Sequence, residues 1–168
     1  QWPSQLKINI TEEVPIARWG GKAFLNRLGE SLNIADNSHL RRLPLLTAEF
    51  GDSTEIMEQY QTLSKLLIPT GLKLTELKLD GLGVWHVKTN RGIRLVIGRE
   101  KVGEKIRRLV LVWQSELYTK SDNIESIDMR YPNGLAVAWR NGGGLSEVNS
   151  YRMINGNANH GIQDTTEV

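Results

Sequence analysis

The chain of 168 residues contains no cysteine. This absence excludes disulfide cross-links and thiol catalysis, although it is compatible with either redox compartment. Long apolar runs are also missing: the longest, such as Leu109 to Trp113, are far shorter than the roughly 20 residues that a membrane-spanning helix needs. The net charge of +2 gives no large field of one sign. The sequence therefore predicts neither a membrane span within these residues nor a nucleic-acid-binding surface.

The composition is that of a soluble globular protein. Hydrophobic residues make up 39% and charged residues 24% of the chain. The length suits one domain, or one domain and a fragment of another. No signal peptide is recognisable. Because the chain begins at Gln1 rather than at Met, we expect it to be a piece of a longer protein.

Catalytic patterns are weak throughout the sequence. The histidines (His39, His86 and His160) are scattered, with no second metal ligand at the close spacing that metal sites use. Gly98 and Gly103 have the spacing of a phosphate-binding loop, but Glu104 stands where that loop needs Lys. We therefore predict no catalytic, cofactor-binding or metal-binding residue.

Two helices and several strands are expected. The helices should run from Ser53, as N-cap, to about Leu67 and from about Arg99 to Leu117. Each carries an apolar stripe at helical spacing: Ile56, Tyr60, Leu63 and Leu67 in the first, and Val102, Ile106, Leu109, Val110, Trp113 and Leu117 in the second. Lys101, Lys105 and Arg108 should lie on the solvent face of the second helix. Strand patterns cover residues 6–11, 23–28, 72–79, 84–89, 93–97, 124–131 and 135–139. Because strands and helices do not alternate strictly, the pattern favours an α+β fold.

A β-hairpin is predicted near the end of the chain. Residues 127–131 are apolar at alternate positions and precede Asn133-Gly134, a pair that tolerates the positive φ angles of a tight turn. The strand that follows, 135–139, would have its larger side chains on one face and only alanines on the other: Leu135, Val137 and Trp139 against Ala136 and Ala138. Tyr131 and Trp139 are either core aromatics of this hairpin or rigid anchors for a partner, and the sequence leaves both alternatives open.

The sequence changes character after Arg140. Residues 141–168 begin Asn-Gly-Gly-Gly, stay polar and show no apolar periodicity, so we predict a disordered tail. The strand 135–139 would then be the last ordered element and an exposed sheet edge. An exposed edge can accept a strand from another protein.

Three stretches together carry a resemblance to a known family. They are Trp2-Pro3 to Arg18-Trp19, with Val14-Pro15-Ile16-Ala17 within it; Ile93 to Arg99; and Ile127-Asp128-Met129-Arg130-Tyr131-Pro132-Asn133-Gly134-Leu135-Ala136-Val137-Ala138-Trp139. In this order they resemble the periplasmic part of the bacterial cell-division protein FtsQ of gammaproteobacteria, over roughly residues 1–139.

The resemblance implies a non-catalytic scaffold of septum assembly (the divisome) in the cell cycle. Family members have one transmembrane helix in the inner membrane, a POTRA domain and a β domain in the periplasm, and form a complex with FtsB and FtsL. The C-terminal strand region of the β domain is where FtsB docks. Carried over by motif, the partner-binding residues are Arg130, Tyr131, Asn133, Gly134 and Trp139, with the backbone of Leu135, Ala136, Val137 and Ala138 as the edge.

The expected architecture follows from both lines of reasoning. Residues 1–13 would be the last strand of a POTRA domain, 14–140 a β domain with a curved, largely antiparallel sheet and two helices, and 141–168 the disordered tail. One alternative is another POTRA-containing protein, such as an outer-membrane assembly or secretion factor. A second is a small periplasmic enzyme, against which the scattered histidines and absent cysteine argue.

Overall fold

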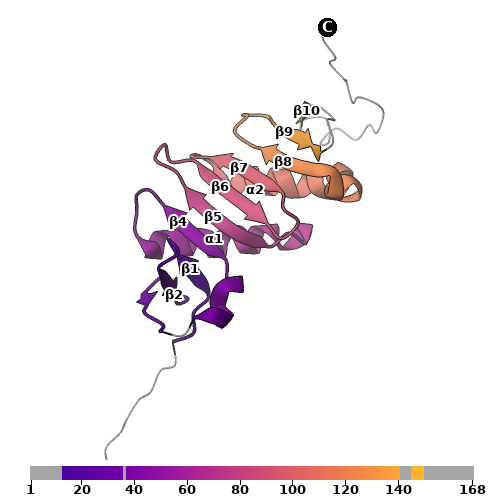
Figure 1. Ribbon diagram of the computed structural model, residues 1–168. Helices are drawn as coiled ribbons and strands as arrows, with labels where there is room; N and C mark the ends of the chain where they lie inside the picture. The colour runs from indigo at the N-terminus through magenta and orange to yellow at the C-terminus, as the bar shows by residue number, and fades with distance from the viewer. Residues whose placement is uncertain (1–12, 36, 141–144, 150–168) are drawn as a thin grey trace, which may run out of the picture.

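The computed structural model describes residues 13–35, 37–140 and 145–149, the last group as backbone only. Its strands form one sheet, with two helices against one face (Figure 1). The strands are β1 (Ala17–Trp19), β2 (Ala23–Leu25), β3 (Ser31–Leu32), β4 (Leu45–Ala48), β5 (Leu74–Leu79), β6 (Trp85–Thr89), β7 (Arg94–Gly98), β8 (Ile124–Asp128), β9 (Gly134–Trp139) and β10 (Leu145–Asn149). The strands between residues 72 and 97, which alternation predicted, are confirmed.

The order across the sheet is β10-β9-β8-β7-β6-β5-β4-β1-β2-β3. The β1–β4, β4–β5 and β7–β8 pairs are parallel, and the other neighbours in the described sheet are antiparallel. Parallel neighbours need a crossover. β1 reaches β4 through β2, β3 and a short 3₁₀ segment, and the helices supply the other two crossovers. Helix α1 (Ser53–Leu67) connects β4 to β5, and α2 (Val102–Val112) lies between β7 and β8. The mixed sheet with two helices confirms the α+β prediction.

Both predicted apolar stripes form the core. Ile56, Leu63 and Leu67 of α1 are buried, as are Ile106 and Leu109 of α2. Helix α2 continues as a π-helical segment, Trp113–Leu117, which buries Trp113 and Leu117. Short 3₁₀ segments complete the connections: η1 (Ser38–Arg42), η2 (Ile68–Thr70) and η4 (Tyr118–Asn123). No helix of the described residues is long and apolar enough to cross a membrane.

The helix starts differ from the prediction by one to three residues. Asp52, not Ser53, caps α1: its carboxylate accepts from the Glu55 N–H at 2.9 Å. Ser53 instead donates its hydroxyl to the Gly29 carbonyl at 2.7 Å. Helix α2 begins at Val102 rather than Arg99, because Gly98 and Lys101 both adopt positive φ angles, 90° and 54°.

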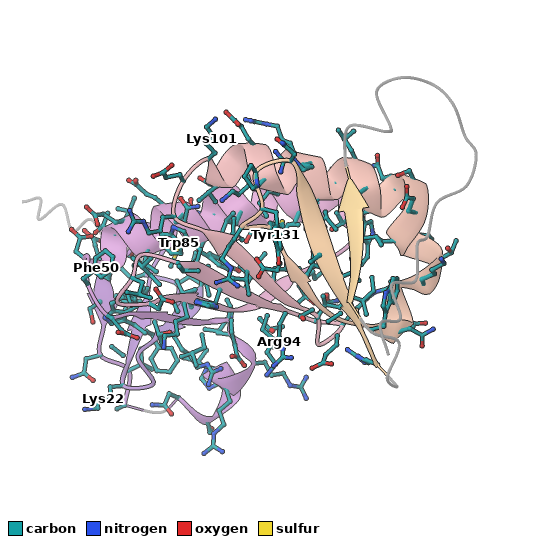
Figure 2. All side chains as sticks on the ribbon, turned by 90° about the horizontal axis from the view of Figure 1, so that it is seen from above. Lys22, Phe50, Trp85, Arg94, Lys101 and Tyr131 are labelled. Carbon is teal, nitrogen blue, oxygen red and sulfur yellow. The ribbon has the colours of Figure 1, made fainter. Side chains whose placement is uncertain are left out.

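The other face of the sheet is polar in the described residues. Cross-strand ion pairs lie on it, such as Lys88 with Glu76 at 3.1 Å. Seen from above, Arg94 of β7 points away from the helices (Figure 2) and pairs with Glu125 of β8. This alternation of buried and charged residues explains why β5 to β8 were recognisable in the sequence.

The structure corrects the expectation for the end of the chain. Residues 145–149, within the predicted tail, form β10 and pair antiparallel with β9. The sequence did not indicate this strand because its apolar residues, Leu145 and Val148, are three positions apart and do not alternate. The remaining tail, 141–144 and 150–168, and the predicted strand at 6–11 lie outside the described residues.

Candidate protein-interaction site

The turn between β8 and β9 is longer than the sequence predicted. Strand β8 ends at Asp128 and β9 begins at Gly134, so five residues connect them. The prediction of a tight Asn133-Gly134 turn is therefore wrong: Gly134 pairs with Asn149 of β10. The pairing of β8 with β9 ends at Asp128 opposite Ala136, while the Met129 N–H donates to the Val96 carbonyl at 2.7 Å and so continues the pairing of β8 with β7.

A salt bridge shapes the start of this turn. The Asp128 carboxylate accepts from the Arg130 backbone N–H and from its guanidinium Nε, both at 3.0 Å. Burial of Asp128 would raise the pKa of its carboxyl, but the bonds from Arg130 outweigh burial and hold that pKa below its usual range. The pair therefore fixes Arg130 at the base of the turn.

Helix α2 holds the same turn from the other side. Arg108 Nη1 donates to the Tyr131 carbonyl at 3.3 Å and to the Gly134 carbonyl at 3.4 Å. Lys105 Nζ donates to the Ile97 carbonyl at 3.0 Å, and partial burial beside Arg108 lowers the Lys105 pKa. Both side chains lie outside the buried stripe, but they are half-buried and bind backbone carbonyls. Their i, i+3 spacing, which puts them on one helix face, was the available signal.

The predicted site residues divide into exposed and buried groups. Exposed side chains come from the turn: Arg130, Tyr131 and Asn133. Leu135 and Val137 of β9 are core residues, exposed by 1% and 0%, and Ala136 is also buried. A partner can thus reach side chains at the turn, whereas along β9 mainly the backbone could supply contacts.

Tyr131 lies in the turn three residues before β9, and Trp139 is the last residue of β9. The strand itself spans five residue steps, or about 17 Å at the rise of a β-strand. Tyr131 is 47% exposed. Trp139 is half-buried, packs against the core, and has the Lys120 ammonium 6.0 Å from its ring centroid. Of the two predicted anchors, Tyr131 is the more accessible.

Strand β9 is not the sheet edge that the sequence predicted. It lies between β8 and β10, and the β10 register runs from Leu145 opposite Ala138 to Asn149 opposite Gly134. The physical reason is that β9 has backbone groups on its outer side that need partners, and residues 145–149 supply them. Strand β10 is the outermost strand at this end of the sheet.

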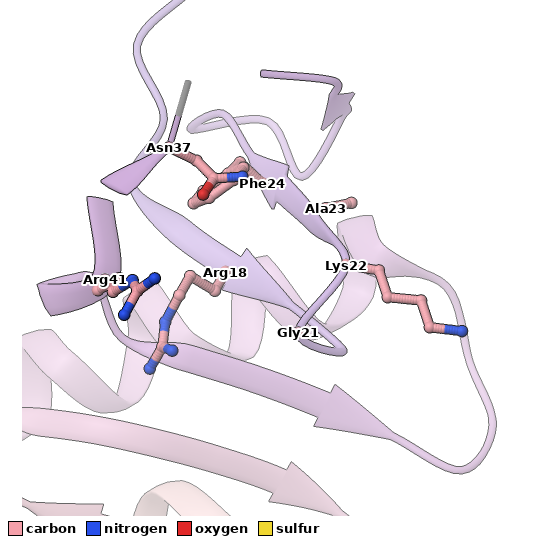
Figure 3. A pocket seen from close by; sticks show the side chains of 7 residues that line it. All are labelled: Arg18, Gly21, Lys22, Ala23, Phe24, Asn37 and Arg41. Carbon is pink, nitrogen blue, oxygen red and sulfur yellow. The ribbon is translucent and has the colours of Figure 1, made fainter. Parts of the chain in front are cut away.

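Two surface hollows are alternative candidate sites. One, of about 360 Å³, lies between the β1–β2 hairpin and η1, with Arg18 and Arg41 beside each other and Lys22 pointing away (Figure 3). The other, of about 480 Å³, is lined by Phe50, Leu82, Trp85 and Arg99 among others. Neither brings together a nucleophile and a base, as a catalytic pocket would require.

The described histidines and carboxylates do not form a metal centre either. Within residues 13–35, 37–140 and 145–149, no three potential metal ligands lie together. His86 Nε2 pairs with Asp80 at 2.8 Å on the polar face of the sheet, and this bond lowers the Asp80 pKa. His39 is exposed on η1, and His160 lies outside the described residues.

Comparison with known proteins identifies relatives. The family model for the C-terminal region of cell division protein FtsQ/DivIB matches residues 17–130, and therefore stops before β9. The chain is 42% identical to cell division protein FtsQ of Cellvibrio japonicus over 142 residues, covering 84% of this chain and 44% of that protein. Identity is 35% with FtsQ of Shewanella oneidensis, over 83% of this chain and 53% of the relative. With FtsQ of Escherichia coli it is 29%, over 83% and 52%. The chain spans about half the length of these relatives.

Proposed function

The chain belongs to the FtsQ/DivIB family of bacterial cell-division proteins, and we propose that it is a non-catalytic scaffold that binds FtsB and FtsL in the assembling septum. The contact would be made by the C-terminal end of the sheet: the turn 129–133 and β9. In the longer protein, residues 1–13 would end a POTRA domain and 14–140 would be the β domain. We place this part of the protein on the periplasmic side of the inner membrane, anchored by a preceding helix.

The observation that supports this site is the contrast between the turn and the strand. The turn offers an exposed aromatic side chain and an exposed cation, Tyr131 and Arg130, on a backbone held by Asp128 and Arg108. Aromatic and arginine side chains on a rigid support are typical of the residues that dominate binding energy. Beside them, β9 is anchored to the core by Leu135 and Val137, which holds its backbone in place for pairing with a strand on its outer side, where β10 lies.

The two alternative functions have less support. A POTRA-containing outer-membrane or secretion factor does not fit the family assignment. A small enzyme would need convergent titratable groups in a pocket, and the two described hollows lack them.

Binding to the periplasmic region of FtsB from the same bacterium tests the proposal. Tyr131→Ala should weaken binding by roughly 1–3 kcal/mol, the range expected of an anchor residue. Tyr118→Ala, at a similarly exposed tyrosine at the start of η4, should leave binding unchanged. Calorimetric titration measures both. Equal affinities for the two variants and the unchanged chain would contradict a binding role for the turn.

A further inference from the structure

Strand β10 occupies the outer side of β9 along nearly its full length. Residues 145–149 pair with residues 138–134 in one continuous antiparallel register. A partner strand added to the sheet at β9 would need the backbone groups that face β10. Both strands cannot use these groups at once.

The two strands differ in how they are anchored. Strand β9 pairs with β8 on its inner side and places Leu135 and Val137 in the core. Strand β10 is outermost, with β9 as its one neighbour in the sheet order. It is joined to β9 through Arg140 and the sequence Asn-Gly-Gly-Gly. Because β9 is its one sheet neighbour, release of β10 breaks no other strand pairing in the described sheet.

We propose that β10 is an internal substitute for the partner's strand, so that a partner binds β9 only after β10 has been released. This inference rests on the proposed function, because it assumes that the partner pairs with β9. Exchange replaces one set of backbone hydrogen bonds with an equivalent set, and the net change in hydrogen-bond energy is small. Side chains at the turn, such as Tyr131, would then favour the partner over β10.

Tethering makes β10 an effective competitor despite its short length. Because β10 follows β9 closely in the same chain, its pairing is intramolecular, with an effective concentration in the millimolar range. The apparent Kd of the partner equals its intrinsic Kd divided by the fraction of molecules in which β9 is free. If β10 is paired in about nine of ten molecules, the apparent Kd rises about tenfold. The same pairing would protect β9 from joining the edge of another copy of the chain before the partner arrives.

A reversible covalent lock tests this inference. Ala138 and Leu145 face each other in the register, and facing residues of antiparallel strands lie within the range that a disulfide spans. Because the chain has no cysteine, Ala138→Cys with Leu145→Cys introduces a single possible bond. Each single substitution serves as a control, and truncation after Arg140 provides the permanently released state. The probe is the periplasmic region of FtsB.

The inference predicts opposite effects of locking and truncation. The oxidised double variant should bind FtsB at least about tenfold more weakly than its reduced form, and truncation should tighten binding several-fold. Equal binding by the oxidised, reduced and truncated chains would overturn the inference and leave the proposed function standing. Failure of the disulfide to form would also overturn it. Absence of binding by every form, including the truncated one, would overturn the proposed function and the inference together.

Discussion

The Arg108 guanidinium donates to the backbone carbonyl of Tyr131 at 3.3 Å, and thereby joins α2 to the turn that precedes β9. The same nitrogen is 3.4 Å from the Gly134 carbonyl, so one side chain spans the turn from both ends. The exposed Tyr131 ring therefore projects from a backbone that the helix holds in place.

Arg108→Ala should loosen the turn. Two long charge-assisted bonds are lost, and we expect a loss of about 1–2 kcal/mol in the free energy of unfolding. Binding to FtsB should weaken as well, because Tyr131 would no longer be held in position. Urea denaturation and titration measure the two effects. Arg107→Ala, at the exposed neighbouring position of α2, is the control and should change neither. Unaltered binding by a folded Arg108 variant would show that the turn needs no support from α2.

Substitutions of Trp113 test whether its side chain is part of the hydrophobic core. Its side chain is 1% exposed, so Trp113→Ala should lower the free energy of unfolding by about 3–5 kcal/mol, as large-to-small core changes do. Trp113→Phe should cost much less, because the buried indole Nε1 has no hydrogen-bond partner among the described residues. Thermal and urea melts compare the two variants. Similar losses for both would mean that the indole N–H, rather than the ring volume, matters here.

Gly29 lies so close to the first residues of α1 that a side chain at this position would clash with them. Its φ is +81°, and a Cβ there would lie 2.5 Å from Thr54 Cα at the start of α1. Gly20 also has a positive φ, +55°, but a Cβ there meets nothing within 4 Å. Both Gly→Ala changes introduce backbone strain. At Gly29 alone, overpacking should lower the free energy of unfolding by a further roughly 1–3 kcal/mol. Unfolding free energies of the two variants measure this difference. Equal unfolding free energies for the two variants would mean that the β2–β3 connection can move away from α1 at little cost.

The Asp128–Arg130 pair should make stability depend on pH. The Asp128 pKa lies below 3.8 in the folded chain, so the unfolded chain takes up a proton first as the pH falls. The pair's contribution is therefore complete well above pH 3.8 and is lost as the pH drops through the lower, folded-state pKa. Asp128→Asn should reduce the difference in unfolding free energy between pH 6 and pH 3. Parallel pH curves for Asp128→Asn and the unchanged chain would contradict a stabilising role for the pair.

Much of the fold could be predicted from local patterns in the sequence. The apolar spacing of Ile56, Leu63 and Leu67 predicted α1, and alternation predicted β5 to β7, because each pattern reports which side of one element faces the core. The site was harder to predict, because its geometry depends on contacts between distant residues. The Met129 bond to Val96 continues the β7–β8 pairing into the turn, and the Arg108 bond to Tyr131 joins positions 23 residues apart.

Strand β10 shows the same limit of sequence reasoning. A five-residue polar segment after Asn-Gly-Gly-Gly has no periodicity to distinguish it from a tail. Its pairing is decided by the unfilled backbone groups of β9, which become apparent only once the sheet is assembled. The sequence predicted β9 as an exposed edge, whereas residues 145–149 of the same chain pair with its outer side.

The most direct test of the proposed site is a map of backbone amide shifts in the chain on addition of the periplasmic region of FtsB. We expect the largest changes on residues 129–139, with changes in β10 as it is released. Largest changes at β3, at the other edge of the sheet, or around the hollow beside Arg18 and Arg41 would contradict it.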